Sequence, residues 1–302
     1  MPTHVISVCT LKHRDVWQKS SALLQVNVEA DHYTVFVPDA ELKEFRRITP
    51  SYIEVAPEES LDFGFFAPLE AAVERAGNTL RHGWYLQQFL KIQALLSSQA
   101  ERIVLWDADC VPVQKMLLFS DEGLPIYMRA TEHHRPYFEA IERLTGLSRP
   151  QDFSFISPGL PFLKSWANQF VNHLESTHTN NTWFEAIISA IDFREESGFS
   201  EYETLGSWVA SQQEGNFLTR AVSWERHGQK LFGEVKDLSQ ADLLDISIGA
   251  DLEVISFELW DTNKTLNRSW ISWQLWQKLL SQVRQPRATL RKLCTATKKR
   301  TK

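Results

Sequence analysis

Two aspartates stand two positions apart directly after an apolar segment near the middle of the chain. Residues 102–112 read RIVLWDADCVP, so Asp107 and Asp109 follow the apolar run at once. Carboxylate oxygens are the hard ligands that Mg²⁺ and Mn²⁺ prefer, and a site with two of them leaves room for phosphate oxygens. The pattern predicts a divalent-metal site that binds a diphosphate. Turn formation at a strand end is the alternative for such a pair.

The segments around this pair predict an α/β protein with a parallel sheet and crossover helices. Short β-branched runs alternate with segments of helical periodicity, which is typical of that architecture. The expected strands are 4–10, 33–37, 51–55, 102–106, 124–128 and 252–259. The expected helices are 15–28, 39–45, 84–98, 136–145, 163–176, 183–193, 203–212 and 269–283, with a loop at 57–68. Ligands bind outside the carboxyl ends of strands in such sheets, where the two aspartates would lie.

The helix, the buried strand and Asp107-Ala108-Asp109 together resemble the donor-binding core of GT-A glycosyltransferases, more distantly the glycogenin-like family. That family has a lysine about 16 residues before the first aspartate, and Lys91 stands at that spacing. Over residues 80–225 the chain is similar to a bacterial family of GT-A-like proteins found in cyanobacteria and proteobacteria. The matching segments are WYLQQFLK (84–91), WDAD (106–109), EHHRPYF (132–138), SFIS (154–157) and GFSEYE (198–203). The segment 158–161, PGLP, departs from the family's pattern and puts the acceptor-side loop in doubt.

The resemblance implies a GT-A (Rossmann-like) mixed sheet flanked by helices and a metal-dependent glycosyltransferase. Its donor would be a nucleotide sugar such as a UDP- or GDP-sugar, and its cofactor Mn²⁺ or Mg²⁺. Its acceptor would be a glycan, a glycolipid or a small molecule, as in surface polysaccharide or glycolipid synthesis. The donor-binding residues expected from it are Thr10, Leu11, Gln88, Lys91, Asp107, Ala108 and Asp109.

Further residues are expected to act on the acceptor side or at the metal. Glu201 and Glu203 stand where a carboxylate could deprotonate an acceptor hydroxyl, and Asp109 is a third catalytic candidate. Helix capping is the alternative, because Ser200 and Glu203 fit the S-x-x-E capping box. His133, His134 and Arg135 could bind the acceptor, or form a solvated loop. His227 is the expected third metal ligand, with a surface histidine as the alternative.

The composition is that of an ordinary soluble globular protein, with 43% hydrophobic and 23% charged residues. Three scattered cysteines disfavour a disulfide framework and a structural zinc site. The N-terminus shows no secretory signal, and no run of about 18 apolar residues suggests a membrane span. A cytoplasmic location is therefore expected.

The C-terminal segment differs from the rest of the chain in charge. After Val283 the chain carries +8, whereas the whole chain carries −6, so residues 1–283 carry −14. An acidic body disfavours nucleic-acid binding. Trp273, Trp276 and Leu280 share one face of the expected helix, and aromatic with basic residues suit contact with an anionic membrane surface. A packed helix with a frayed tail is the alternative. We expect a GT-A domain over residues 1–265 and this extension over 266–302.

Two other functions remain open from the sequence. A sugar-phosphate nucleotidyltransferase uses a similar sheet and two-carboxylate metal chemistry, but it usually begins with a glycine-rich phosphate loop. Residues 10–15, TLKHRD, contain no glycine, which disfavours it. A non-catalytic nucleotide-binding protein is the third possibility. The presence of Asp107, Asp109 and Lys91 together argues against a decayed site.

Overall fold

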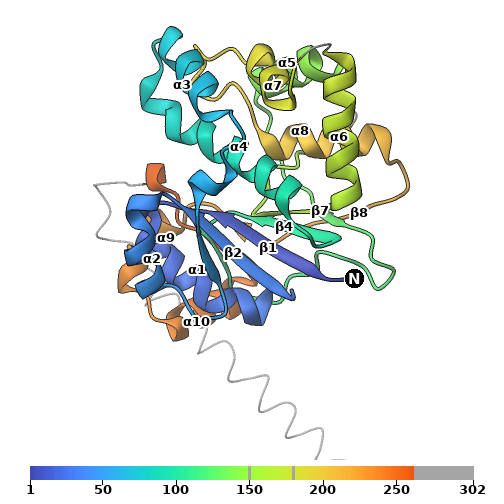
Figure 1. Ribbon diagram of the computed structural model, residues 1–302. Coiled ribbons are helices and arrows are strands. Elements are labelled where there is room, and N and C mark those ends of the chain that lie inside the picture. Colours follow the sequence, from blue (N-terminus) through green and yellow to red (C-terminus); the bar gives the residue numbers. More distant parts are fainter. Residues whose placement is uncertain (149–150, 179–180, 262–302) are drawn as a thin grey trace, which may run out of the picture.

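A five-stranded mixed sheet lies at the centre of the molecule (Figure 1). The computed structural model describes residues 1–148, 151–178 and 181–261. The strand order is β3-β2-β1-β4-β7, with the first four strands parallel and β7 antiparallel to β4. The strands are β1 (Thr3–Val8), β2 (His32–Val37), β3 (Glu54–Pro57), β4 (Arg102–Trp106) and β7 (Gly159–Leu163). The predicted α/β class, a mixed sheet flanked by helices, is confirmed.

Helices cover both faces of this sheet (Figure 1). On the upper face in that view, α4, α6 and α8 lie next to the sheet with α3, α5 and α7 above them, whereas α1, α2, α9 and α10 lie below. The bounds are α1 (Arg14–Asn27), α2 (Leu42–Ile48), α3 (Phe66–Arg75), α4 (His82–Ser97), α5 (Arg135–Thr145), α6 (Lys164–Thr177), α7 (Trp183–Ala190), α8 (Glu201–Gln212), α9 (Gly228–Phe232) and α10 (Gln240–Ala250). Short 3₁₀ helices are η1 (Leu11–His13), η2 (Asp39–Glu41), η3 (Glu58–Leu61), η4 (Thr79–Arg81), η5 (Val235–Asp237) and η6 (Leu259–Asp261).

Alternating side chains of β4 enter two separate hydrophobic clusters. Ile103 and Leu105 pack in the upper cluster, and Val104 and Trp106 pack in the lower one. A parallel strand that is buried on both faces has a continuous apolar sequence, as residues 102–106 do. The core therefore holds β4 rigidly up to the residue that precedes Asp107.

Two small sheets bring later parts of the chain to the end of β4. β5 (Cys110–Pro112) pairs with β10 (Val254–Ser256), which in turn pairs with β9 (Trp224–Glu225). β6 (Ile126–Met128) pairs with β8 (Leu218–Arg220). Because β5 begins one residue after Asp109, the pairing with β10 places residues 224–258 beside the aspartate pair.

Several expected elements are confirmed within a few residues, and others are corrected. The expected loop 57–68 contains η3 and the start of α3, whose apolar residues Leu69, Ala72 and Val73 recur at helical spacing. The strand β7 was not expected from the sequence, because Pro161 disfavours a strand; β7 lies at the edge of the sheet, where proline is compatible with it. The expected helix 269–283, the basic tail and the boundary at 265/266 lie outside the described residues.

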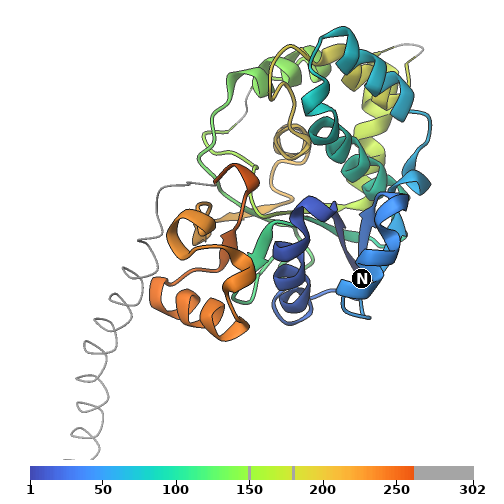
Figure 2. The same cartoon turned by 90° about the vertical axis from the view of Figure 1, so that its left-hand side faces the viewer.

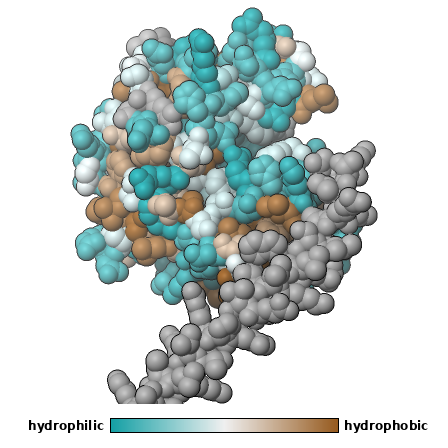
Figure 3. Space-filling view, turned by 180° about the vertical axis from the view of Figure 1, so that it is seen from behind, coloured by the Kyte–Doolittle hydropathy of each residue, from teal (hydrophilic) through white to brown (hydrophobic). Residues whose placement is uncertain are grey.

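The surface mixes polar and apolar residues. Seen from behind, hydrophilic residues predominate, and several hydrophobic residues gather in the lower half of the view (Figure 3). Within the described residues, none of the helices is both long and apolar enough to span a membrane.

The contact between α8 and the segment before β7 depends on a glycine. A Cβ added at Gly206 would overlap the ring of Phe155, which is fully buried. We predict that Gly206→Ala lowers stability by about 1–3 kcal/mol, because the ring or the helix must shift. Thermal unfolding would measure this. Gly83→Ala in α4 is the control, since its added Cβ meets no atom within 4 Å. Equal melting temperatures for both variants would contradict this account of α8 packing.

Candidate functional site

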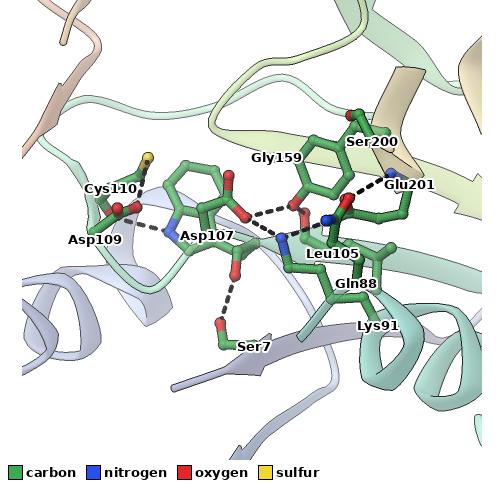
Figure 4. A network of polar contacts seen from close by, with 12 residues as sticks. Ser7, Gln88, Lys91, Leu105, Asp107, Asp109, Cys110, Gly159, Ser200 and Glu201 are labelled. Carbon is green, nitrogen blue, oxygen red and sulfur yellow. Dashed lines mark hydrogen bonds and ion pairs between the residues drawn. The ribbon is translucent and has the colours of Figure 1, made fainter. Parts of the chain in front are cut away.

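A buried lysine joins two carboxylates at the carboxyl end of β4 (Figure 4). The Nζ atom of Lys91, from α4, lies 2.5 Å from Oδ1 of Asp107 and 2.7 Å from Oε1 of Glu201. The side chains of Lys91 and Glu201 are 8% and 6% exposed, whereas that of Asp107 is 29% exposed. Burial alone would lower the pKa of Lys91, but the two carboxylates outweigh it and raise that pKa. The ammonium therefore stays charged and connects the end of β4 to the start of α8.

Tyr202, on α8, contacts both Asp107 and Lys91. Its hydroxyl lies 3.0 Å from the carbonyl oxygen of Leu105 and 3.1 Å from Oδ1 of Asp107. Its ring lies below the Lys91 ammonium, 4.4 Å from Nζ, a cation–π distance. Both contacts of Asp107 end on Oδ1, so they orient the carboxylate and leave Oδ2 for a ligand.

The start of α8 is fixed against α4. The Ser200 hydroxyl accepts a hydrogen bond from the backbone N–H of Glu203, as an N-cap does. The backbone N–H of Glu201 donates to Oε1 of Gln88 at 3.1 Å. The Tyr85 hydroxyl accepts from the N–H of Gly198. These contacts place Glu201 opposite Asp107 before any ligand binds.

Asp109 and Cys110 complete a cluster of groups that could hold a metal ion. One ligand atom each from Asp107, Asp109 and Cys110 lie within 4.8 Å of one another. Burial and the charge of Asp107 raise the pKa of Asp109 to about 6. Burial, with the charges of Asp109 and Asp107, also raises the pKa of the Cys110 thiol, so this sulfur stays protonated. The two carboxylates therefore fit a hard divalent ion, whose charge would relieve their repulsion.

Residues from β9, β10 and the following segment form the wall beyond Asp109. The backbone N–H of Phe257 donates to the carbonyl oxygen of Asp109 at 3.0 Å. Next to Phe257, Glu258 pairs with Arg226 at 3.1 Å, and Arg226 also pairs with Glu132 at 2.5 Å. Burial raises the pKa of Glu258, and the negative charge of Asp109 raises it further, whereas Arg226 lowers it. A chain of charges thus runs from Glu132 through Arg226 to Glu258, next to the residue whose backbone bonds to Asp109.

The expected donor-binding residues lie in different environments. Lys91, Asp107 and Asp109 come together, and Ala108 is buried between the two aspartates. Gln88 is 2% exposed and binds the start of α8. Thr10 precedes η1, and the backbone N–H of Leu11 donates to Oε2 of Glu41 at 2.7 Å. Their donor contacts remain predictions.

Of the two glutamates on α8, the structure brings Glu201 alone to Asp107. Glu203 has no exposed surface, and its Oε2 accepts hydrogen bonds from the Ser154 hydroxyl and the Phe155 backbone N–H. A fully buried carboxylate with these two hydrogen bonds holds the segment before β7, which disfavours the predicted catalytic role of Glu203. Glu201 remains the catalytic candidate.

The two histidines and the arginine proposed for the acceptor side lie at the start of α5 and have different contacts. His134 bonds through Nε2 to the carbonyl oxygen of Ser197 at 2.8 Å, and the His133 ring packs on Phe138 at 4.9 Å. Arg135 is the first residue of α5, and its mostly exposed side chain pairs with Glu139. Their contact with an acceptor remains a prediction.

The backbone of His227, but not its ring, is connected to the cluster of Asp107, Asp109 and Cys110. It forms an antiparallel bridge with Phe257, whose N–H binds Asp109. Its Nδ1 lies 3.4 Å from Oε1 of Glu225, and its ring is not one of the groups within 4.8 Å of one another. Three residues near the site, Tyr202, Arg226 and Glu258, were not predicted from the sequence. Tyr202 could have been found from its place in GFSEYE, whereas the other two come near Asp109 only through the pairing of β5 with β10.

Comparisons with known proteins give a family match and matches to solved structures at low sequence identity. Residues 15–230 match the family described as "Family of unknown function (DUF6492)". No curated protein sequence matches the chain at a significant level. The apo structure of mouse xyloside xylosyltransferase 1 is 11% identical with a TM-score of 0.46, covering 87% of this chain and 100% of its own. An active-site mutant of LgtC is 10% identical with a TM-score of 0.42, covering 92% of this chain and 95% of its own.

The raised pKa of Asp109 predicts that this carboxylate destabilises the ligand-free protein. In the folded protein Asp109 keeps its proton up to about pH 6, whereas in the unfolded chain it loses that proton near pH 3.8. The free energy of unfolding therefore falls as the pH rises from 3.8 to about 6. Asp109→Asn removes the charge and should raise stability at pH 7.5 by roughly 1–2 kcal/mol, with a smaller effect at pH 4.5.

Thermal unfolding at the two pH values, without metal, would measure this difference. Asp121→Asn is the control, because Asp121 is exposed on a turn. A lower melting temperature for Asp109→Asn at pH 7.5, or a gain matched by the control, would show that Asp109 is not under electrostatic strain.

Proposed function

We propose that this chain, which belongs to the DUF6492 family, is a metal-dependent glycosyltransferase that moves a sugar from a nucleotide-sugar donor to a hydroxyl acceptor. The observation that carries the proposal is the arrangement of Asp107 and Asp109 at the carboxyl end of β4, with Lys91 and Glu201 beside them. Ligands of open α/β sheets bind at this edge. The sequence motifs that resemble GT-A enzymes fall on the same residues.

Asp107 and Asp109 would hold Mn²⁺ or Mg²⁺. A divalent ion bound there would neutralise charge on the departing diphosphate. Lys91 and Tyr202 hold Asp107 through Oδ1, which fixes the direction of its other oxygen. Because the core holds these groups before binding, little reorganisation is needed when charge develops on the leaving group.

Glu201 is the candidate for orienting or deprotonating the acceptor hydroxyl. Its carboxylate shares the Lys91 ammonium with Asp107, so it lies one side chain away from the metal-binding cluster. A UDP- or GDP-sugar suits the donor side, because the site presents two carboxylates for an ion that would bridge phosphates. The acceptor would be a glycan, a glycolipid or a small molecule with a free hydroxyl.

The proposal predicts that the intact protein binds nucleoside diphosphates only with a divalent ion. Isothermal titration of UDP and of GDP with Mn²⁺ should show binding, and chelation of the ion should abolish it. Asp107→Ala should weaken binding at least tenfold, about 1.4 kcal/mol, because it removes a ligand. Asp121→Ala should bind as the parent does.

The melting temperature of each variant without ligand controls for folding. If neither nucleotide binds the parent with Mn²⁺, or if a folded Asp107→Ala variant binds as well as the parent, the proposed function is wrong.

A further inference from the structure

Trp260 stands out because its large ring is exposed yet held in place. Its side chain is 60% exposed, whereas the other tryptophans in the described part of the chain are buried or half-buried. Its Nε1–H donates to Oε2 of Glu258. The ring of His227 meets it edge-on, with centroids 5.5 Å apart and planes at 86°. An exposed ring with fixed orientation loses little side-chain entropy when a ligand binds it.

The short helix η6 that carries Trp260 is tied to its surroundings by polar contacts. Oδ2 of Asp261, at its end, accepts from the backbone N–H of Lys230 at 3.0 Å. Glu258, just before it, pairs with Arg226. Figure 2 shows this red end of the described chain beside the orange helices of the late segment. The indole is therefore positioned by the protein rather than left on a loose end.

Short contacts connect Trp260 to the backbone of Asp109 in the candidate site. Three residues before it, the N–H of Phe257 donates to the carbonyl oxygen of Asp109. His227, which touches the indole, forms a backbone bridge with the same Phe257. The contacts place an exposed aromatic face, a carboxylate and an imidazole together at the rim of the site.

We propose that the exposed face of Trp260 stacks against one pyranose ring of the acceptor, with Glu258 and His227 as hydrogen-bond partners for its hydroxyls. One face of a pyranose presents C–H groups, which are apolar and weakly positive, and the face of an indole is apolar and negative. Acidic and imidazole groups beside the ring suit the hydroxyls at the sugar's edge. The identification of the stacked sugar as the acceptor rests on the proposed function, since the stacking itself requires only a sugar.

Ligand-detected NMR with the full chain tests this without relying on turnover. Methyl glucoside, galactoside and mannoside, as α and β anomers, would be titrated with Mn²⁺ and UDP present. We expect at least one glycoside to bind, Trp260→Ala to weaken it about fivefold or more, and Trp260→Phe to keep most of the affinity. Leu259→Ala is the matched control, because Leu259 is an adjacent side chain that is 45% exposed and offers no ring.

Two further results separate this inference from the proposed function. If UDP binds with Mn²⁺ but no glycoside does, or if Trp260→Ala binds glycosides as the parent does, the proposed stacking of a sugar on Trp260 is wrong and the transferase proposal stands. If glycosides bind through Trp260 but UDP does not, the transferase proposal falls instead. If Trp260→Ala weakens UDP-glucose more than UDP, the ring holds the donor sugar, and the acceptor assignment is overturned.

Discussion

The ion pair of Lys91 with Asp107 and Glu201 is the interaction on which the site depends. Removing an ammonium from water costs several kcal/mol, and two carboxylates at 2.5 and 2.7 Å offset that cost here. A well-packed apolar replacement would often be as stable, so such a group of charges is weak evidence for stability. Its position at the carboxyl end of β4 gives it another use, because it holds charged groups in fixed positions where a ligand binds.

The second constraint is the pairing of β5 with β10. It brings a segment more than a hundred residues later in the chain to the backbone of Asp109. The segment contributes Arg226, Glu258 and Trp260 to the rim, and the salt bridges of Arg226 extend the connection to Glu132. The aspartate pair is therefore held by the central sheet, whereas the wall beyond Asp109 is held by the separate sheet of β5, β10 and β9.

Local patterns in the sequence were enough to predict the four parallel strands of the central sheet and the aspartate pair, but not the edge strand β7. The apolar run of residues 102–106 predicts a buried strand because both of its faces pack in the core. Lys91 was found through spacing that resembles a known family. The burial of Glu203 was not predictable, since the capping pattern that it shares with Ser200 does not show which carboxylate faces Asp107. The place of Glu258 depends on pairing between distant strands, which leaves no local signal.

The most direct test of the central claim is anomalous diffraction from crystals of the protein grown with Mn²⁺ and UDP. The account predicts an anomalous peak at about 2.0–2.3 Å from carboxylate oxygens of both Asp107 and Asp109, with the UDP phosphates on its open side. It also predicts that Lys91 still pairs with Glu201. A manganese peak elsewhere, or nucleotide bound with Lys91 turned away and Asp107 free of metal, would contradict it.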